Sequence, residues 1–213
     1  MINVKIPALN KDIKVDRLIN SITGTKQTPT IIIIAGIHGN ETSGLVAAEK
    51  VLKEIKEREI WVKGNVYAIT GNMNALKKGV RYTALDLNRI WTHDHIEKIN
   101  SGEGDFVDEE YELIAMYSLL KQLMQTEKGP FIFLDLHSTS AYTTPFITIS
   151  DSINNRKFSY KFPVPIVLGI EEHLDGPLLS YINEFGHIAL GFESGQHDDI
   201  EAIKSSEAFI WLA

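Results

Sequence analysis

The sequence predicts an α/β fold in which a mixed, mostly parallel central sheet has helices on both faces. The run at residues 30–37 is apolar without alternation, which is typical of a strand that is covered on both sides, and residues 131–136 predict a further strand. Segments with helical periodicity lie between the expected strands, so strand and helix alternate along the chain. A chain of 213 residues is long enough for one sizeable core, and we expect residues 1–213 to form a single domain.

The first half of the chain predicts two strands, one helix and a long loop. The run TIIIIAGI at residues 30–37 is rich in β-branched residues and predicts a buried strand. A helix is expected from about residue 41 to 58, with Asn40 as its N-cap, because apolar residues recur at helical spacing: Leu45, Ala48, Leu52 and Ile55. Residues 65–70 predict a second strand. A loop is expected from residue 71 to about 108, a length that is uncommon unless the loop is functional or mobile.

The second half continues the alternation. Residues 109–125 carry an apolar helical stripe, which Gly129-Pro130 ends before the strand at residues 131–136. Further elements are expected as strands at 146–150, 164–170 and 187–193, a short helix at 177–185, and a final helix from about 198. That final helix is still apolar at Trp211-Leu212 and has no stop signal, so we expect the natural protein to continue beyond residue 213.

Composition argues against several classes of partner. A formal net charge of -7, with no basic run longer than two residues, works against binding to nucleic acid or to anionic membranes. No segment has the length and apolarity of a signal peptide or a membrane span, so we expect a cytoplasmic protein with a small-molecule partner. A homo-oligomer is compatible with the sequence. The chain has no cysteine, so any metal site must use nitrogen and oxygen ligands.

Three of the expected strands end in polar side chains. His38 with Glu41, His137, and Glu193 follow or end apolar strands, and in open α/β sheets the ligand crevice lies beyond the carboxyl ends of the strands. Two histidines and one glutamate leave the fourth tetrahedral position of Zn²⁺ open for water, as catalytic zinc requires. Taken singly, these residues could be a core histidine, a helix N-terminal charge and a loop donor. Their joint position favours a metal site.

The segment GVRYTALDLNRIW at residues 79–91 is the second signal. It places two arginines, an aspartate and an asparagine within nine positions of a stretch that has no other pattern. From spacing alone, a binding loop and a solvated turn explain it equally well.

In their order along the chain, these residues resemble the motifs of the succinylglutamate desuccinylase/aspartoacylase family, which is related to the zinc carboxypeptidases. The resemblance extends over about residues 31–195 and depends on His38-x-x-Glu41, Arg81, Asp86-Leu87-Asn88-Arg89, Asp135-Leu136-His137 and Glu193. It implies a zinc carboxypeptidase-like fold and one Zn²⁺ per chain, with three ligands: His38, Glu41 and His137.

The resemblance also implies the roles of the other residues. Glu193 would be the general base, and Arg81 would polarise the scissile carbonyl. Asn88 and Arg89 would hold a substrate carboxylate, a task for which the planar guanidinium of arginine is well shaped. Asp86 would orient the first zinc histidine.

Asp135 has two interpretations. Strand periodicity puts it on the same face as His137, so it either supports that imidazole or caps the following turn, and we favour support.

The function expected from these features is a zinc-dependent amidohydrolase, or deacylase. It would cleave the amide bond of an N-acyl amino acid or a similar small carboxylic acid by attack of zinc-activated water. A zinc carboxypeptidase acting on short peptides is the alternative enzyme. A binding protein that keeps the zinc pocket without turnover is the alternative of another class.

Two departures from the family pattern bear on this expectation. Members that act on acetylaspartate have an arginine shortly before the catalytic glutamate, whereas this chain has Asn183 ten residues before Glu193 and no arginine between them. Selectivity for a dicarboxylic amino acid is therefore disfavoured. Family enzymes also usually continue into a smaller β-rich C-terminal domain, which we expect to be absent from these 213 residues.

The remaining histidines carry no comparable signal. His93, His95 and His187 lack a carboxylate partner at a telling spacing, and His173 follows two glutamates in an expected surface loop. His197 lies four residues after Glu193 and either lines the cleft or is a plain loop histidine, of which we favour the loop histidine.

Overall fold

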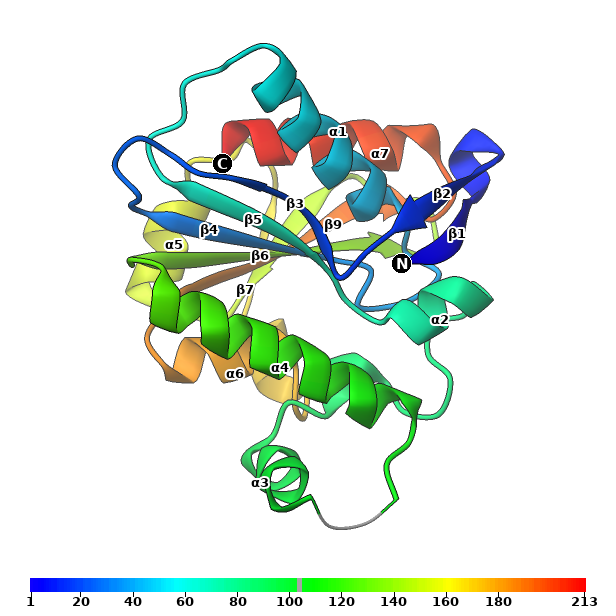
Figure 1. Ribbon diagram of the computed structural model, residues 1–213. Helices are drawn as coiled ribbons and strands as arrows, with labels where there is room; N and C mark the ends of the chain where they lie inside the picture. The colour runs from blue at the N-terminus through cyan, green and yellow to red at the C-terminus, as the bar shows by residue number, and fades with distance from the viewer. Residues whose placement is uncertain (103–104) are drawn as a thin grey trace.

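The computed structural model describes residues 1–102 and 105–213, and it confirms the mixed, mostly parallel sheet. Within these residues the main sheet has seven strands in the order β3-β5-β4-β6-β9-β7-β8 (Figure 1). Only the pairs β3/β5 and β7/β9 of this sheet run antiparallel. A separate hairpin contains β1 and β2. The strand bounds are β1 Ile2–Ile6, β2 Lys11–Val15, β3 Leu18–Ile22, β4 Thr30–Ala35, β5 Asn65–Thr70, β6 Phe131–Thr139, β7 Phe146–Ile149, β8 Ile166–Leu168 and β9 Ile188–Gln196.

Helices cover both faces of this sheet. In Figure 1, α1 (Ser43–Glu57) and α7 (Ile200–Leu212) lie on one face, and α4 (Asp108–Thr126) and α6 (Leu178–Glu184) lie on the other. The core is accordingly divided in two: Ile33 packs with α1 and α7, whereas Ile32 and Ile34 pack with α4 and α6. Successive strand residues point to opposite faces, so a strand covered on both sides is apolar at every position.

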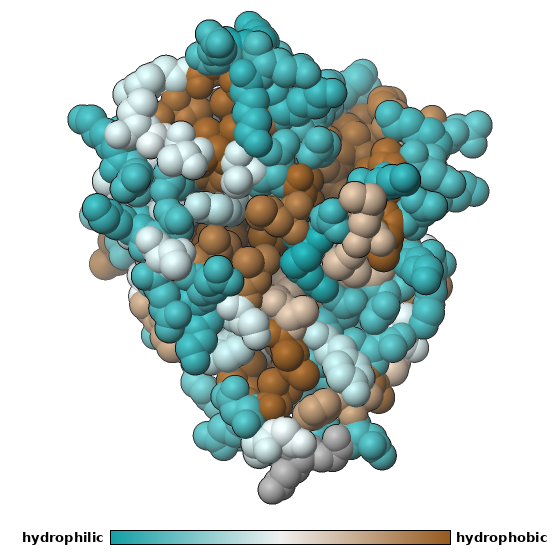
Figure 2. Space-filling view, in the orientation of Figure 1, coloured by the Kyte–Doolittle hydropathy of each residue, from teal (hydrophilic) through white to brown (hydrophobic). Residues whose placement is uncertain are grey.

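Some apolar residues remain at the surface. On the face shown in Figure 1, hydrophobic residues reach the surface in a broken band down the middle, with hydrophilic residues on either side (Figure 2). Of the helices in the described part of the chain, none combines the length and the apolarity needed to cross a membrane.

Strand register brings the candidate site residues to one edge of the sheet. In the parallel pairing of β4 with β6, Ala35 lies opposite Leu136, so both strands reach this edge together. In the pairing of β6 with β9, His137 lies opposite Glu193. His38 follows the end of β4 by three residues, and Glu41 lies in the turn before α1. The expected gathering of strand ends is therefore present.

Several element boundaries differ from those expected. Helix α1 begins at Ser43, and its N-cap residue is Thr42, so the prediction of Asn40 as the cap is wrong. The expected loop at residues 71–108 contains three helical segments: α2 (Met73–Lys78), the 3-10 turn η2 (Leu87–Arg89) and α3 (His93–Ser101). Residues 103–104 of that stretch lie outside the described residues. The side chains of Asn72 and Thr92 cap α2 and α3, signals that periodicity does not detect.

Other short elements were not expected from the sequence. They are the strands β1, β2 and β3 and the helical segments η1 (Pro7–Leu9), α5 (Ile153–Ser159) and η3 (Ile170–His173). The segment of η3 matters for the site because it leads into the residues before α6.

We expect Gly44→Ala to destabilise the fold, although alanine usually stabilises a helix by about 1 kcal/mol relative to glycine. A Cβ at this position of α1 would lie 2.7 Å from the Cβ of Leu136 and 3.2 Å from that of Ala35. Overpacking of this kind costs about 1–3 kcal/mol. Urea denaturation should show a lower free energy of unfolding for Gly44→Ala. Lys53→Ala, an exposed change on the same helix, should alter it by less than about 0.5 kcal/mol. A stabilised Gly44→Ala protein would contradict the close contact.

Candidate metal centre

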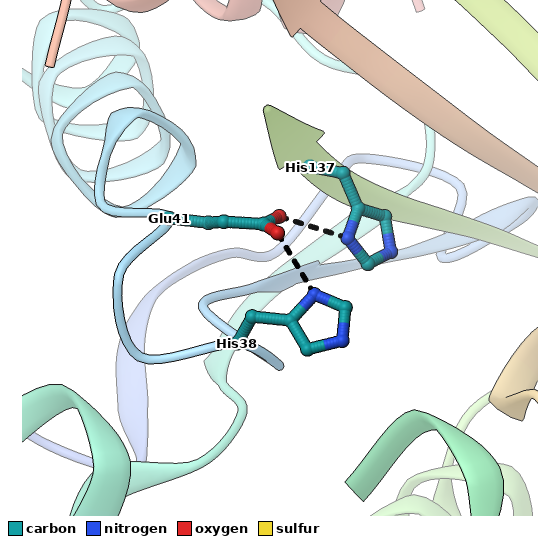
Figure 3. Close-up of side chains that lie close together, drawn as sticks. All are labelled: His38, Glu41 and His137. Atoms are coloured by element: carbon teal, nitrogen blue, oxygen red, sulfur yellow. Dashed lines mark hydrogen bonds and ion pairs between the residues drawn. The ribbon is translucent and has the colours of Figure 1, made fainter. Parts of the chain in front are cut away.

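Three side chains predicted as metal ligands converge at the edge of the sheet. The carboxylate of Glu41 lies between two imidazoles, with Oε1 2.9 Å from Nδ1 of His38 and Oε2 3.0 Å from Nδ1 of His137 (Figure 3). One ligand atom from each residue can be chosen so that all three lie within 4.8 Å of one another. All three residues are buried, with 3%, 3% and 8% of their surface exposed for His38, Glu41 and His137. The cluster is thus small enough to hold one ion.

The outer nitrogen of each imidazole is held by a carboxylate. Nε2 of His38 lies 3.1 Å from Oδ1 of Asp86, and Nε2 of His137 lies 2.9 Å from Oδ2 of Asp135. A proton on each Nε2 would leave the lone pair of Nδ1 directed at the centre of the cluster. Two imidazole nitrogens and one carboxylate oxygen are a donor set that Zn²⁺ and similar divalent ions accept. The residues therefore fit a metal ion.

Electrostatics favour a cation at this position. Burial alone would raise the pKa of Glu41, but its hydrogen bonds with His137 and His38 outweigh burial and hold that pKa well below the usual range. Burial would lower the pKa of His137, but Asp135 and Glu41 raise it well above its ordinary value. In both cases the charged form is stabilised by hydrogen bonds with neighbours of opposite charge. A divalent cation would replace the protons of the imidazoles and supply positive charge beside these carboxylates.

Glu193 lies beside the cluster with one oxygen unpaired. Its Oε2 is buried and has no hydrogen-bond partner among the described residues. Burial raises the pKa of Glu193 to about 7, against the opposing charge of His137. Buried polar atoms in native structures nearly always have a partner, so an unpaired carboxylate oxygen in a cleft indicates a place for water or a ligand.

The three candidate ligands and Glu193 line one cleft with a volume of about 360 Å³. Arg81 reaches into it from residues 79–91 and lies 3.4 Å from Glu41 and 3.2 Å from Asp86. The side-chain oxygen of Asn88 accepts the backbone N–H of Leu178 at 2.9 Å, and its amide N–H groups have no partner among the described residues. Arg89 donates to the backbone oxygen of Asn88 at 2.7 Å. The segment that the sequence left open as a binding loop or a solvated turn is therefore part of the cleft.

Glu109 positions this segment and was not identified from the sequence. Its carboxylate accepts hydrogen bonds from both the N–H and the hydroxyl of Thr83, and from the N–H groups of Ala84 and Leu85, at 2.6 to 3.1 Å. The amide of Asn72 donates to it at 3.1 Å. In the sequence, Glu109 looks like one of three acidic residues that begin a helix, which explains its N-terminal position but not these contacts.

His197 is also part of the cleft, which contradicts our preference for a plain loop histidine. It contributes to the cleft lining, and its Nδ1 lies 2.7 Å from the hydroxyl of Ser138. The backbone N–H of Ser138 donates to Oε2 of Glu41 at 3.1 Å. Ser138 thus links His197 to the buried carboxylate.

Two other histidines and Asn183 lie away from the cleft. His93 is exposed and pairs with Glu184 at 2.7 Å, and His187 packs against phenylalanine rings at the start of β6. Asn183 is not among the residues that line the cleft. Its amide is occupied by internal hydrogen bonds with Asn155, Ser150 and the backbone of Leu179.

Comparison with known proteins identifies the family. Residues 27–207 match the succinylglutamate desuccinylase/aspartoacylase catalytic domain. The chain is 35% identical to a succinylglutamate desuccinylase of Pseudomonas fluorescens over 69 residues, 32% of this chain and 21% of that protein. It is 31% identical to the Pseudomonas aeruginosa enzyme of that name over 108 residues, 51% of this chain and 30% of that protein. The matched segments thus span less than a third of these relatives.

A solved structure shows the same fold. The crystal structure of succinylglutamate desuccinylase from Chromobacterium violaceum aligns with a TM-score of 0.71 at 15% identity, over 89% of this chain and 62% of that one. The α/β fold expected from the resemblance is therefore confirmed.

We expect Glu109→Gln to lower the free energy of unfolding by about 1–3 kcal/mol at pH 7. The NH₂ group of glutamine would face N–H groups that now donate hydrogen bonds to the carboxylate. The hydrogen bonds from Thr83, Leu85 and Asn72 outweigh burial and lower the pKa of Glu109 to about 2. A lowered folded-state pKa means that the ionised group stabilises the fold above its unfolded pKa of about 4.3, and that this contribution is lost as the pH falls toward 2.

The difference in free energy of unfolding between the parent and Glu109→Gln should therefore be largest at pH 7. It should decrease as the pH falls from about 5 to about 3, measured by urea denaturation. Glu97→Gln, at an exposed position of α3, is the matched control and should show little difference at any pH. If the difference in free energy of unfolding stays constant over this pH range, ionised Glu109 does not anchor the loop.

Proposed function

Because this chain belongs to the succinylglutamate desuccinylase/aspartoacylase family, a family of deacylases, we propose that it is a zinc-dependent amidohydrolase. Its substrate would be an N-acyl amino acid or a similar small carboxylic acid. The proposal is carried mainly by one observation: His38, Glu41 and His137 converge in a cleft where Glu193 has an unpaired buried oxygen. The chain spans only part of the length of its relatives, so their activity is an inference for this protein.

The three ligands would hold the ion through Nδ1 of His38, Nδ1 of His137 and the carboxylate of Glu41. Zn²⁺ bound there would polarise the amide carbonyl and lower the pKa of a water to roughly 7. Asp86 and Asp135 hold the outer nitrogens of the two histidines, so both rings are oriented before any ion or substrate arrives.

Glu193 is the general base in this proposal. Its unpaired Oε2 can take the proton of the attacking water and then deliver that proton to the nitrogen of the departing amine. Burial raises the pKa of Glu193, which favours a carboxyl that takes up the proton of the water and can release it again.

The segment at residues 79–91 supplies the positive charges. Arg81 lies beside Glu41, where its guanidinium can stabilise the negative charge that develops on the carbonyl oxygen. Within the described part of the chain, the amide N–H groups of Asn88 have no partner, and Arg89 has further N–H groups besides the one that donates to the backbone oxygen of Asn88. Together they can hold the carboxylate of the substrate.

The Glu193→Gln variant tests the general base. We expect it to retain the metal content of the parent while hydrolysis of N-acyl amino acids falls by about 10²- to 10⁴-fold, since only the proton acceptor is removed. Activity would be measured on a panel of N-acyl amino acids and short peptides, which also separates a deacylase from a carboxypeptidase. Glu201→Gln, an exposed change on α7, is the control and should keep full activity. A Glu193→Gln protein as active as the parent would exclude Glu193 as the base.

Removal of metal tests the ligand set. Dialysis against a chelator should abolish hydrolysis, and added Zn²⁺ should restore it, with one ion bound per chain by elemental analysis. His137→Ala should bind the ion at least about 10-fold more weakly, because a direct ligand is lost. His93→Ala removes an exposed histidine outside the cleft and should leave metal binding unchanged. Equal metal content in the two variants would contradict the proposed centre.

A further inference from the structure

The cleft contains one apolar wall that the proposed chemistry does not use. It is formed by side chains from β7, from the segment at η3 and from the start of α6: Phe146, Ile170, Leu174, Pro177 and Leu179. Ile170 and Leu174 are 46% and 38% exposed, so apolar surface stands open to water at the site. A ligand that covered this wall with an apolar group would be favoured by burial of that surface.

The cationic groups of the cleft are few. Arg81 already lies between two carboxylates, those of Glu41 and Asp86. Arg89 has no carboxylate partner among the described residues, and with the free amide of Asn88 it offers donors for one carboxylate. His197 is tied through Nδ1 to Ser138, so it offers one ring nitrogen rather than the paired N–H groups of a guanidinium.

Asn183 cannot supply a second anchor for an acid. Its side-chain oxygen accepts from Asn155 at 2.9 Å, and its NH₂ donates to Ser150 at 3.2 Å and to the backbone oxygen of Leu179 at 2.8 Å. The group is neutral, and turning it toward the cleft would break all three hydrogen bonds. A second carboxylate placed against the apolar wall would lose its hydration without a charged partner, which is costly.

From this division of the cleft, we infer that the substrate is a monocarboxylic N-acyl amino acid with an aliphatic or aromatic side chain, and not a dicarboxylic one. One carboxylate is held by Asn88 and Arg89, and the apolar side chain covers the wall that contains Leu174 and Ile170. The inference rests on the proposed function for the identity of the bond that is cleaved. The preference for the apolar side chain is a binding property and can be measured separately.

Binding is measured by calorimetry on the zinc-loaded Glu193→Gln chain, which holds ligand without turning it over. N-acetyl-leucine should bind at least about 10-fold more tightly than N-acetylaspartate, since the two share the acyl group and differ in the group that meets the wall. Turnover of the same two compounds by the parent chain is measured in parallel.

Two substitutions to arginine test whether the preference for N-acetyl-leucine depends on the apolar wall. In the Glu193→Gln background, Leu174→Arg should narrow or reverse the ratio of the two affinities, because it places a guanidinium in the apolar wall. Leu168→Arg is the matched control: Leu168 is similarly exposed, at 43%, on β8, but does not line the cleft. It should leave the ratio unchanged.

The outcomes separate the two claims. Equal or tighter binding of N-acetylaspartate, or no binding of either acid, overturns the inference. A preference for N-acetylaspartate that disappears in His197→Gln also overturns it, and would assign the second carboxylate to His197. If N-acetyl-leucine is preferred in binding but neither compound nor any other N-acyl amino acid is hydrolysed, the deacylase function fails while the ligand preference stands.

Discussion

The candidate site depends on one buried carboxylate, that of Glu41, which stands between imidazoles from two different strand ends. Its oxygens lie 2.9 Å from Nδ1 of His38 and 3.0 Å from Nδ1 of His137, and the N–H of Ser138 reaches the second oxygen at 3.1 Å. A buried carboxylate without such partners would strongly destabilise the fold. The contacts that stabilise Glu41 therefore also hold the two histidines at one point, where β4, α1 and β6 meet.

A second buried carboxylate, that of Glu109, fixes the segment that carries Arg81. Glu109 at the start of α4 accepts backbone N–H groups from residues 83–85, the segment that lies between Arg81 and Asp86. The positive charge of Arg81 is thus placed through the packing of a helix that lies on one face of the sheet. Both carboxylates have lowered pKa values, because both accept several hydrogen bonds in their charged form. These two buried carboxylates therefore position the side chains that line the cleft.

Buried strands and long helices could be predicted from the sequence, whereas several short helices could not. The strand at residues 65–70 was predicted at its observed bounds, and α4 was placed within one residue at each end, because long apolar patterns repeat the geometry of the element. Helices α2 and α3 have six and nine residues, with two and one buried positions. So few buried residues produce no detectable period, and tertiary contacts with the rest of the chain stabilise these helices instead.

The sequence by itself determined the fold class, the family and the three side chains that gather at the sheet edge. It could do so because strand patterns are local and parallel strands end at a common edge. Only the tertiary structure decided that Glu109 anchors the loop, that Ser138 and His197 belong to the cleft, and that the amide of Asn183 is used internally. Those contacts join residues that are far apart in the chain, so they depend on how helices pack on the sheet, which no local pattern records.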